Sequence, residues 1–258
     1  MPKKKIVALG LFVALLAAAT GMVFAAKDTG LPAQAGCNLS RGKLDELKFV
    51  QENPDIDYVQ RTTAELKIRK ALLKEAAGCA IEEAAAIKSG LTKTEAREPE
   101  AESLKKQFLG RLEDALNYYE LQKSKIEDLG LQGSRNFARE LKEWRDGNYK
   151  PAAKLASNFI IWAQNQELLQ SAQNRLDQIA STVSILKLVY NEDIQNLWRG
   201  ADQNFNEARK ANQEAKLNLR ASLPDEALNS IKSSLTALAK TYGNLFDLFA
   251  GINKSLKP

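Results

Sequence analysis

The sequence predicts an all-α protein, built as an elongated bundle of long antiparallel amphipathic helices. Apolar residues recur at steps of three and four over long segments, helix start and stop signals flank those segments, and no segment alternates like a strand. The composition agrees, since 44% of the 258 residues are hydrophobic and only 14 are Gly and 7 Pro. An α-solenoid is the alternative, although no repeat of solenoid period is found.

Four helices are expected in the first half of the bundle. The first begins near Ser40, a good N-cap residue, and is broken by Asn53-Pro54. A long second helix ends at Ser89-Gly90, and the third begins with Pro99 in its first turn and is closed by Gly130. A shorter fourth helix is expected over residues 134–147, ending at a glycine.

Three further helices complete the expected bundle. One opens at Pro151 and keeps its apolar period to about Val189. Asn191 is expected to cap the next, whose first turn is acidic and therefore suits the helix dipole. The last follows the start signal Ser222-Leu223-Pro224-Asp225. Residues 40–258 thus form the bundle, with a subdivision into 40–130 and 134–258 as an option.

Residues 1–25 have the pattern of a secretory signal peptide. Three lysines precede an apolar run over residues 6–26, and Val23 and Ala25 occupy the small-residue positions of a cleavage site after Ala25. The run is also long enough to stay as an uncleaved N-terminal anchor, which would be the chain's one membrane contact. Either interpretation predicts an extracytoplasmic protein: secreted, periplasmic or at the cell surface. Residues 26–39 are expected to be a linker.

The net charge argues against a nucleic-acid partner. Removing the three lysines of residues 1–25 from the 37 basic residues leaves 34 against 32 acidic residues, so the net charge falls from +5 to +2. Phosphate binding needs a concentrated basic face, which this balance does not provide.

Cys37 and Cys79 are the two cysteines of the chain. In an exported protein such a pair favours one disulfide. Two unpaired thiols are the alternative, and because the spacing is not C-x-x-C a redox role has no support.

The sequence also excludes several catalytic chemistries and predicts that the protein is not an enzyme. It contains no His, so neither a Ser-His-Asp nor a Cys-His nucleophile can form, and no His-based metal site exists. Ser-x-x-Lys occurs three times, but its companion S-D-N and K-T-G elements are missing. No metal or other cofactor is predicted.

Three tryptophans and two arginines are candidates for an interaction site. Trp144-Arg145 and Trp198-Arg199 pair residue types that are common at interfaces, and Trp162 is a third aromatic. A small-ligand receptor would gather the three tryptophans near a pocket at a bundle end. Each Trp lies on an apolar stripe, however, so a place in the core or at its edge is favoured.

The segment between Asn158 and Asn218 holds seventeen Asn and Gln residues. A neutral, solvated face is the favoured interpretation. The sharper one is a hydrogen-bonding groove for a peptide or glycan, with Gln164 and Gln166 as candidates, because amides both donate and accept. Gln166 falls within the apolar stripe and could belong to a buried polar layer that fixes the helix register.

The leading functional hypothesis is therefore an exported, non-enzymatic helical protein of the cell envelope, acting as a structural or protein-interaction module with a protein partner. The alternative is an extracytoplasmic protein that binds a small ligand, peptide or glycan. The sequence leaves the partner and the oligomeric state open.

Overall fold

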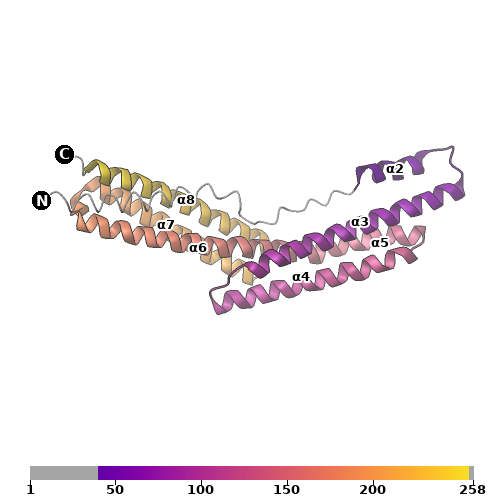
Figure 1. Ribbon diagram of the computed structural model, residues 1–258, viewed down its shortest axis with the longest axis horizontal. Coiled ribbons are helices and arrows are strands. Elements are labelled where there is room, and N and C mark those ends of the chain that lie inside the picture. Colours follow the sequence, from indigo (N-terminus) through magenta and orange to yellow (C-terminus); the bar gives the residue numbers. More distant parts are fainter. Residues whose placement is uncertain (1–39, 256–258) are drawn as a thin grey trace.

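The computed structural model describes residues 40–255 and shows an elongated, all-α bundle with no strand in that range (Figure 1). Its α-helices, in chain order, are α2 (Arg41–Glu52), α3 (Tyr58–Lys93), α4 (Pro99–Lys125), α5 (Leu131–Trp144), α6 (Lys150–Ile185), α7 (Glu192–Arg220) and α8 (Pro224–Ser255). The predicted helical bundle is confirmed. The segments predicted to be a signal peptide or anchor and a linker, together with Cys37, lie outside the described residues.

Several predicted helix boundaries are confirmed and others move by a few residues. Asn53 follows the last residue of α2, Pro99 is the first residue of α4, and the Asn191 side chain accepts from the backbone N–H of Ile194 at 3.1 Å. Asp57 caps α3, accepting from two backbone N–H groups. The α3 helix runs through Gly90 to Lys93, because one glycine costs a helix too little to end it where the tertiary packing continues.

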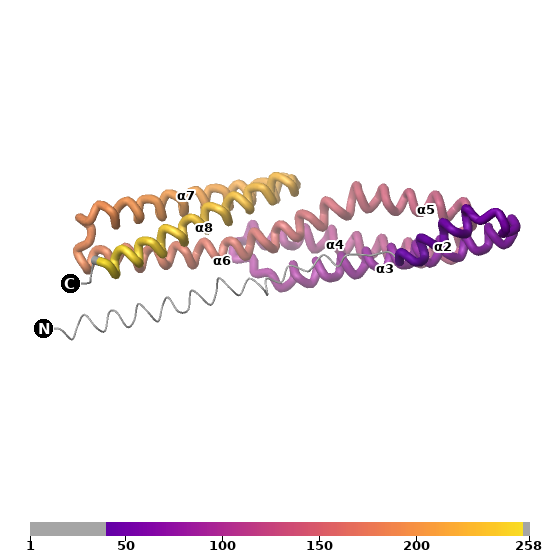
Figure 2. Tube along the Cα trace, turned by 90° about the horizontal axis from the view of Figure 1, so that it is seen from above, coloured from indigo at the N-terminus to yellow at the C-terminus, as the bar shows by residue number. Residues whose placement is uncertain are grey.

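The predicted break at Gly147 is wrong. The chain passes from α5 through a π-helical turn, η3 (Arg145–Tyr149), directly into α6, with helical backbone at both junctions. A regular helix would press the Pro151 ring against the carbonyl of Gly147, and the wider π turn lies where this conflict would occur. Leu131 to Ile185 therefore form one continuous rod, about 80 Å long at 1.5 Å per residue, which Figure 2 shows running through both halves of the molecule.

The first half of the molecule packs α3 and α4 against α5 and the beginning of α6. Its core contains fully buried aromatic and aliphatic side chains, including Phe108 and Phe159, whose rings meet edge to face with centroids 5.8 Å apart. The short helix α2 lies along α3, where Val50 contacts Ile68 and Leu72 in a small separate cluster. Helix α2 therefore adds to the bundle with little apolar burial of its own.

The second half is a three-helix coiled coil of α6, α7 and α8. Buried seam positions follow alternating steps of three and four, with one step of seven in α7 where the partly exposed position 198 falls: 158, 162, 165, 169, 172, 176 and 179 in α6; 194, 201, 205, 208, 212, 215 and 219 in α7; and 227, 231, 234, 238, 241, 245, 248 and 252 in α8. This heptad spacing keeps one seam of each helix facing its partners. Leu228, Tyr242 and Phe249 lie beside the α8 seam and are partly exposed.

The two halves overlap where the α7–α8 turn meets the start of α4. Ala215, Leu219, Ala227 and Ile231 belong to the same core cluster as α3 and α4. Outside this contact, Lys216 pairs with Glu98 at 2.5 Å and with Glu100 at 2.7 Å. These two carboxylates raise the pKa of the Lys216 ammonium group against the opposing effect of its burial.

Within residues 40–255, no helix is both long enough and apolar enough to cross a membrane.

A buried carboxylate holds α2, α3 and α5 together. Glu65 is only 4% exposed and accepts from Gln51 at 2.9 Å, from Arg69 at 2.7 Å and from Arg135 at 2.8 Å. Burial by itself raises the pKa of Glu65, but hydrogen bonds from Arg135, Arg69 and Gln51 outweigh it and lower the pKa to about 2.

We predict that acid weakens this half of the molecule through Glu65. Because the folded pKa of about 2 lies below the ordinary value of 4.5, the stabilisation is complete above pH 4.5 and is lost as the pH falls toward 2. Urea unfolding followed by circular dichroism should show Glu65→Gln less stable at pH 7 by about 1–3 kcal/mol, with a smaller further loss in acid. The exposed Glu52→Gln is the control, and equal acid profiles for wild type and Glu65→Gln would refute this role.

Candidate functional site

A layer of polar side chains crosses the three-helix coiled coil between its two apolar cores. Asn165 of α6 donates through Nδ2 to Asn212 Oδ1 of α7 at 3.0 Å and to Ser234 Oγ of α8 at 2.8 Å. Ser234 Oγ in turn donates to the carbonyl oxygen of Ala208 at 2.7 Å. All three polar residues are at most 3% exposed. The layer separates the core cluster that ends at Ala163 of α6 from the one that begins at Leu169.

Two more hydrogen bonds tie α6 to its partners beside this layer. The Trp162 indole Nε1 donates to the carbonyl oxygen of Asn212 at 3.1 Å, and Asn158 Nδ2 donates to the carbonyl oxygen of Pro224 at 2.7 Å. The Asn165 Oδ1 atom is buried and accepts no hydrogen bond from the described residues. These hydrogen bonds form only when Asn165, Asn212 and Ser234 lie at the same height along the coiled coil. The layer therefore fixes the register of α6, α7 and α8.

The predicted polar layer thus exists one residue away from its expected position. Gln166 is partly exposed, and Asn165 occupies the heptad position between Trp162 and Leu169. Steps of three and four counted through Asn158, Trp162 and Leu169 point to position 165, and this register is the sequence signal that could have identified it.

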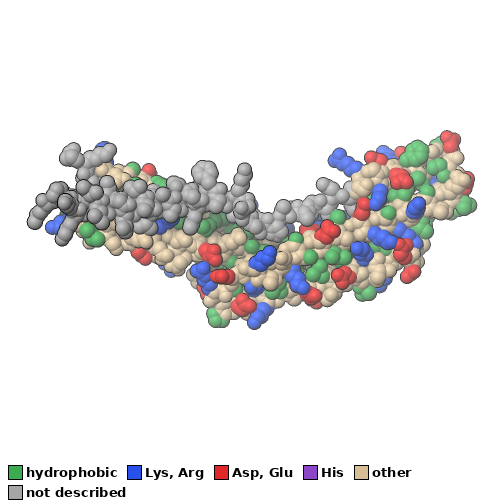
Figure 3. All heavy atoms as spheres, in the orientation of Figure 1, with side chains coloured by type: hydrophobic (Ala, Val, Ile, Leu, Met, Phe, Trp, Pro, Cys, Tyr) green, Lys and Arg blue, Asp and Glu red, His purple; other side chains and the backbone are tan. Residues whose placement is uncertain are grey.

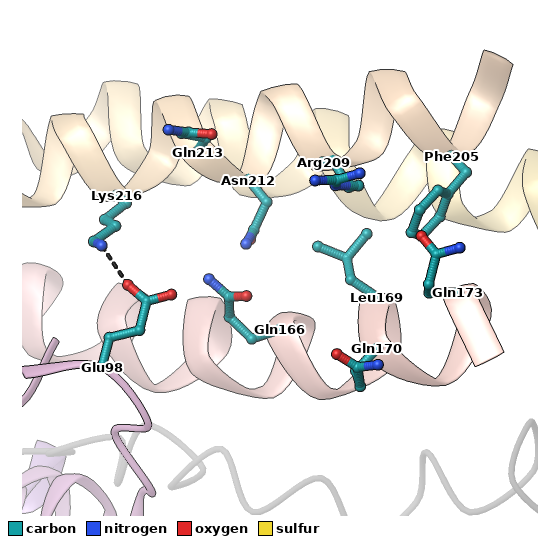
Figure 4. A pocket seen from close by; sticks show the side chains of 10 residues that line it. All are labelled: Glu98, Gln166, Leu169, Gln170, Gln173, Phe205, Arg209, Asn212, Gln213 and Lys216. Carbon is teal, nitrogen blue, oxygen red and sulfur yellow. Dashed lines mark hydrogen bonds and ion pairs between the residues drawn. The ribbon is translucent and has the colours of Figure 1, made fainter. Parts of the chain in front are cut away.

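An open groove runs along the same level of the coiled coil, between α6 and α7. Its volume is about 470 Å³, and its lining is Glu98, Gln166, Leu169, Gln170, Gln173, Phe205, Arg209, Asn212, Gln213 and Lys216. Figure 4 shows Gln166 and Gln173 pointing from α6 toward α7, and Asn212 pointing back. A smaller hollow of about 180 Å³ shares Glu98, Gln166 and Gln170 with it and adds residues of the α3–α4 connection and Trp162.

The unequal spacing of the three helices accounts for this groove. Helix α7 packs more closely on α8 than on α6. A Cβ atom on Gly251 would lie 2.9 Å from Ile194 Cδ1, and the Ser234 hydroxyl reaches the α7 backbone at Ala208. On the α6 side, the larger Leu169 and Phe205 form the floor, and long glutamine side chains line the walls.

The structure brings only two of the predicted interaction residues, Trp162 and Gln166, to one place, the smaller hollow. Trp162 is 2% exposed there and therefore offers almost no ring surface. Gln164 is partly exposed and lines neither the groove nor the hollow. Sequence reasoning missed the other polar residues of the groove, because α7 contributes four of these seven residues and its position against α6 is a tertiary feature.

The other predicted residues lie elsewhere, so the cluster of three tryptophans that the receptor alternative requires does not form, and each Trp lies in a core or at its edge, the place that the sequence favours. Trp144 stacks on Tyr118 with ring centroids 3.7 Å apart, about 27 Å along the helical rod from Trp162 at 1.5 Å per residue. Arg145 Nη2 donates to Glu83 Oε2 at 2.7 Å and lies over the Tyr149 ring. Through these contacts Trp144 and Arg145 join α5 and η3 to α4 and α3.

Trp198 and Arg199 lie near the start of α7, where only Trp198 of the two reaches the second core cluster. Trp198 packs against that core and is partly exposed, and Arg199 Nη2 donates to Gln195 Oε1 at 3.1 Å. Heptad spacing places a large side chain at position 198 beside the core whether or not a ligand binds there.

The charges visible on the surface favour no single sign. On the face drawn in Figure 3, Lys and Arg side chains alternate with Asp and Glu side chains over α3 and α4. Within residues 40–255, no group of three carboxylates or thiols is placed to hold a metal ion.

Comparison with known proteins gives no relative to guide interpretation: no family model, no curated protein and no solved structure matches the chain.

We predict that the polar layer costs stability but specifies register. Asn165→Ala should lower the free energy of unfolding by about 1–3 kcal/mol, because Asn212 Oδ1 and Ser234 Oγ lose their donor. A triple variant with Asn165→Leu, Asn212→Leu and Ser234→Ala should regain that stability and lose the unique register.

Urea unfolding measures the stability, and amide NMR spectra report whether one packing or several are present. Gln178→Ala, an exposed amide of α6, is the matched control. A triple variant with a single sharp set of amide signals would contradict the role in register.

Proposed function

We propose that this chain is an exported, non-enzymatic helical protein of the cell envelope that acts as a structural or protein-interaction module. The leader-like sequence of residues 1–25 supports export. The elongated shape supports the role as a structural or protein-interaction module. One helical rod of about 80 Å runs from Leu131 to Ile185 and is shared by both halves of the molecule. The shared rod holds the two halves at a fixed separation.

The open groove between α6 and α7 is the single observation that carries the interaction role. Amide side chains line it over about two turns of α6, at the height along the coiled coil where the polar layer fixes the register. Binding sites on rigid elements keep their geometry, so little conformational entropy is lost when a partner binds. The same groove favours the second candidate, an extracytoplasmic receptor for a small ligand, peptide or glycan.

Fractionation and cross-linking in cells that naturally make the chain test the leading proposal. The chain is expected outside the cytoplasm, with its N-terminus at Ala26 after cleavage or at Met1 if residues 6–26 remain as an anchor. Amine-reactive cross-linking is expected to join it to a protein. Recovery of the chain in the cytosol with residues 1–25 intact and without membrane attachment would refute export, and ligand binding without any cross-linked protein would favour the receptor.

The proposed extracytoplasmic location also predicts that the two cysteines are oxidised to a disulfide. An exported chain should join Cys37 to Cys79, which would close a 43-residue loop and stabilise the fold by about 4 kcal/mol in the chain-entropy model. Cys79 lies partly exposed in α3. Alkylation of the unfolded, unreduced protein followed by intact-mass measurement should find no modified thiol. Two alkylated cysteines would contradict the disulfide.

A further inference from the structure

The groove between α6 and α7 presents hydrogen-bonding groups that the protein itself does not use. The side-chain amides of Gln166 and Gln213 make no hydrogen bond with any residue of the range 40–255. Gln170 and Gln173 each donate once through Nε2, to Asn174 at 3.1 Å and to Asp177 at 2.9 Å, and their carbonyl oxygens stay available.

Asn212 joins the groove to the buried layer. Its side chain is 3% exposed, and its Oδ1 atom accepts from Asn165 at 3.0 Å. Its nitrogen donates to no described residue and points across the groove toward Gln166 (Figure 4). A buried side chain that is fixed at one end and open at the other is a preorganised donor, because no rotamer freedom has to be lost on binding.

These open groups suit an extended chain better than a helix. A helix satisfies its own backbone N–H and C=O groups, so a fourth helix in the groove would leave the glutamines without partners. An extended peptide exposes both groups along its length, at about 3.3 Å per residue. Gln166, Gln170 and Gln173 span about 10 Å along α6, the length of about three extended residues.

The lining also favours a peptide over a glycan. Sugar rings pack on exposed aromatic faces, and the aromatic side chains here offer none: Phe205 is 3% exposed and Trp162 2% exposed. Leu169 and Phe205 lie at the base of the groove and are only 6% and 3% exposed, so the contacts that remain for a ligand are mainly polar.

One cation of the groove is available for an acidic group. Lys216 is engaged by Glu98 and Glu100. Arg209, by contrast, lies over the Phe205 ring at 5.9 Å and pairs with no carboxylate among the described residues. A guanidinium group binds a carboxylate in a two-pronged geometry, which places one acidic side chain of the ligand.

We propose that this groove binds an extended peptide segment that carries a carboxylate side chain, with its backbone hydrogen-bonded to Gln166, Gln170 and Asn212 and its carboxylate paired with Arg209. This inference rests on the proposed interaction role and names the kind of segment that a partner protein would supply.

The test uses the full mature chain and a displayed library of random twelve-residue peptides. Selected peptides should share an Asp or Glu and should lack an amphipathic helical pattern. Synthetic copies labelled with a fluorophore then give dissociation constants by fluorescence anisotropy. Arg209→Gln should weaken binding about threefold to tenfold, as expected for one solvent-exposed charge-assisted contact.

Matched variants separate the groove from general effects of charge or folding. Lys210→Gln removes the same charge one residue away, outside the groove lining, and should leave the dissociation constant unchanged. Gln166→Ala should weaken binding and Gln178→Ala should not. Unchanged far-ultraviolet circular dichroism spectra show that each variant is folded.

Several outcomes overturn the proposal. Peptides bound equally by wild type and by Arg209→Gln would place the contact elsewhere, and an absence of enriched peptides would exclude this ligand class. A glycan that binds wild type but not Gln166→Ala would replace the peptide. If the chain is still cross-linked to a protein in cells after any of these results, the interaction role survives and only this site fails.

Discussion

Burial of successive stretches of one continuous helix in two different cores is the constraint on which this structure depends. The beginning of α6 packs against α3 and α4, and the rest of it packs against α7 and α8. Because the rod from Leu131 to Ile185 passes from one core to the other without a break, neither bundle can turn relative to the other without bending a helix. Elongation follows from this, since two bundles that share one rod must lie end to end.

The layer of polar side chains lies where one core ends and the other begins along α6. An apolar seam alone tolerates a shift of one heptad, because Leu and Ile side chains pack almost as well against the next layer. Asn165, Asn212 and Ser234 remove that freedom, because only one register pairs them. The unpaired Asn165 Oδ1 atom shows that specificity is obtained here at some cost in stability.

The groove is a consequence of side-chain size in α6 and α7. Ala201, Ala208 and Ala215 are fully buried and let α7 lie close to its neighbour, whereas Phe205 and Leu169 keep α6 further away. Glutamines occupy the remaining space, and their long polar side chains leave it open to solvent. A surface that is polar and still concave is unusual beside a coiled-coil seam, where apolar side chains normally fill the space.

The sequence by itself determined the helical class, most helix ends and the amide enrichment, because periodicity, Asn191 and Pro99 act locally. It did not determine that α5 continues into α6, since Gly147 and Pro151 favour a break until packing on Glu83 and the aromatic cluster holds the π turn in place. Nor did the sequence determine which Asn and Gln side chains are buried, which line the groove and which face solvent. Whether Asn165 is buried, Gln166 lines a groove or Gln178 faces solvent depends on how close α7 lies to α6, and only packing between distant segments decides that distance.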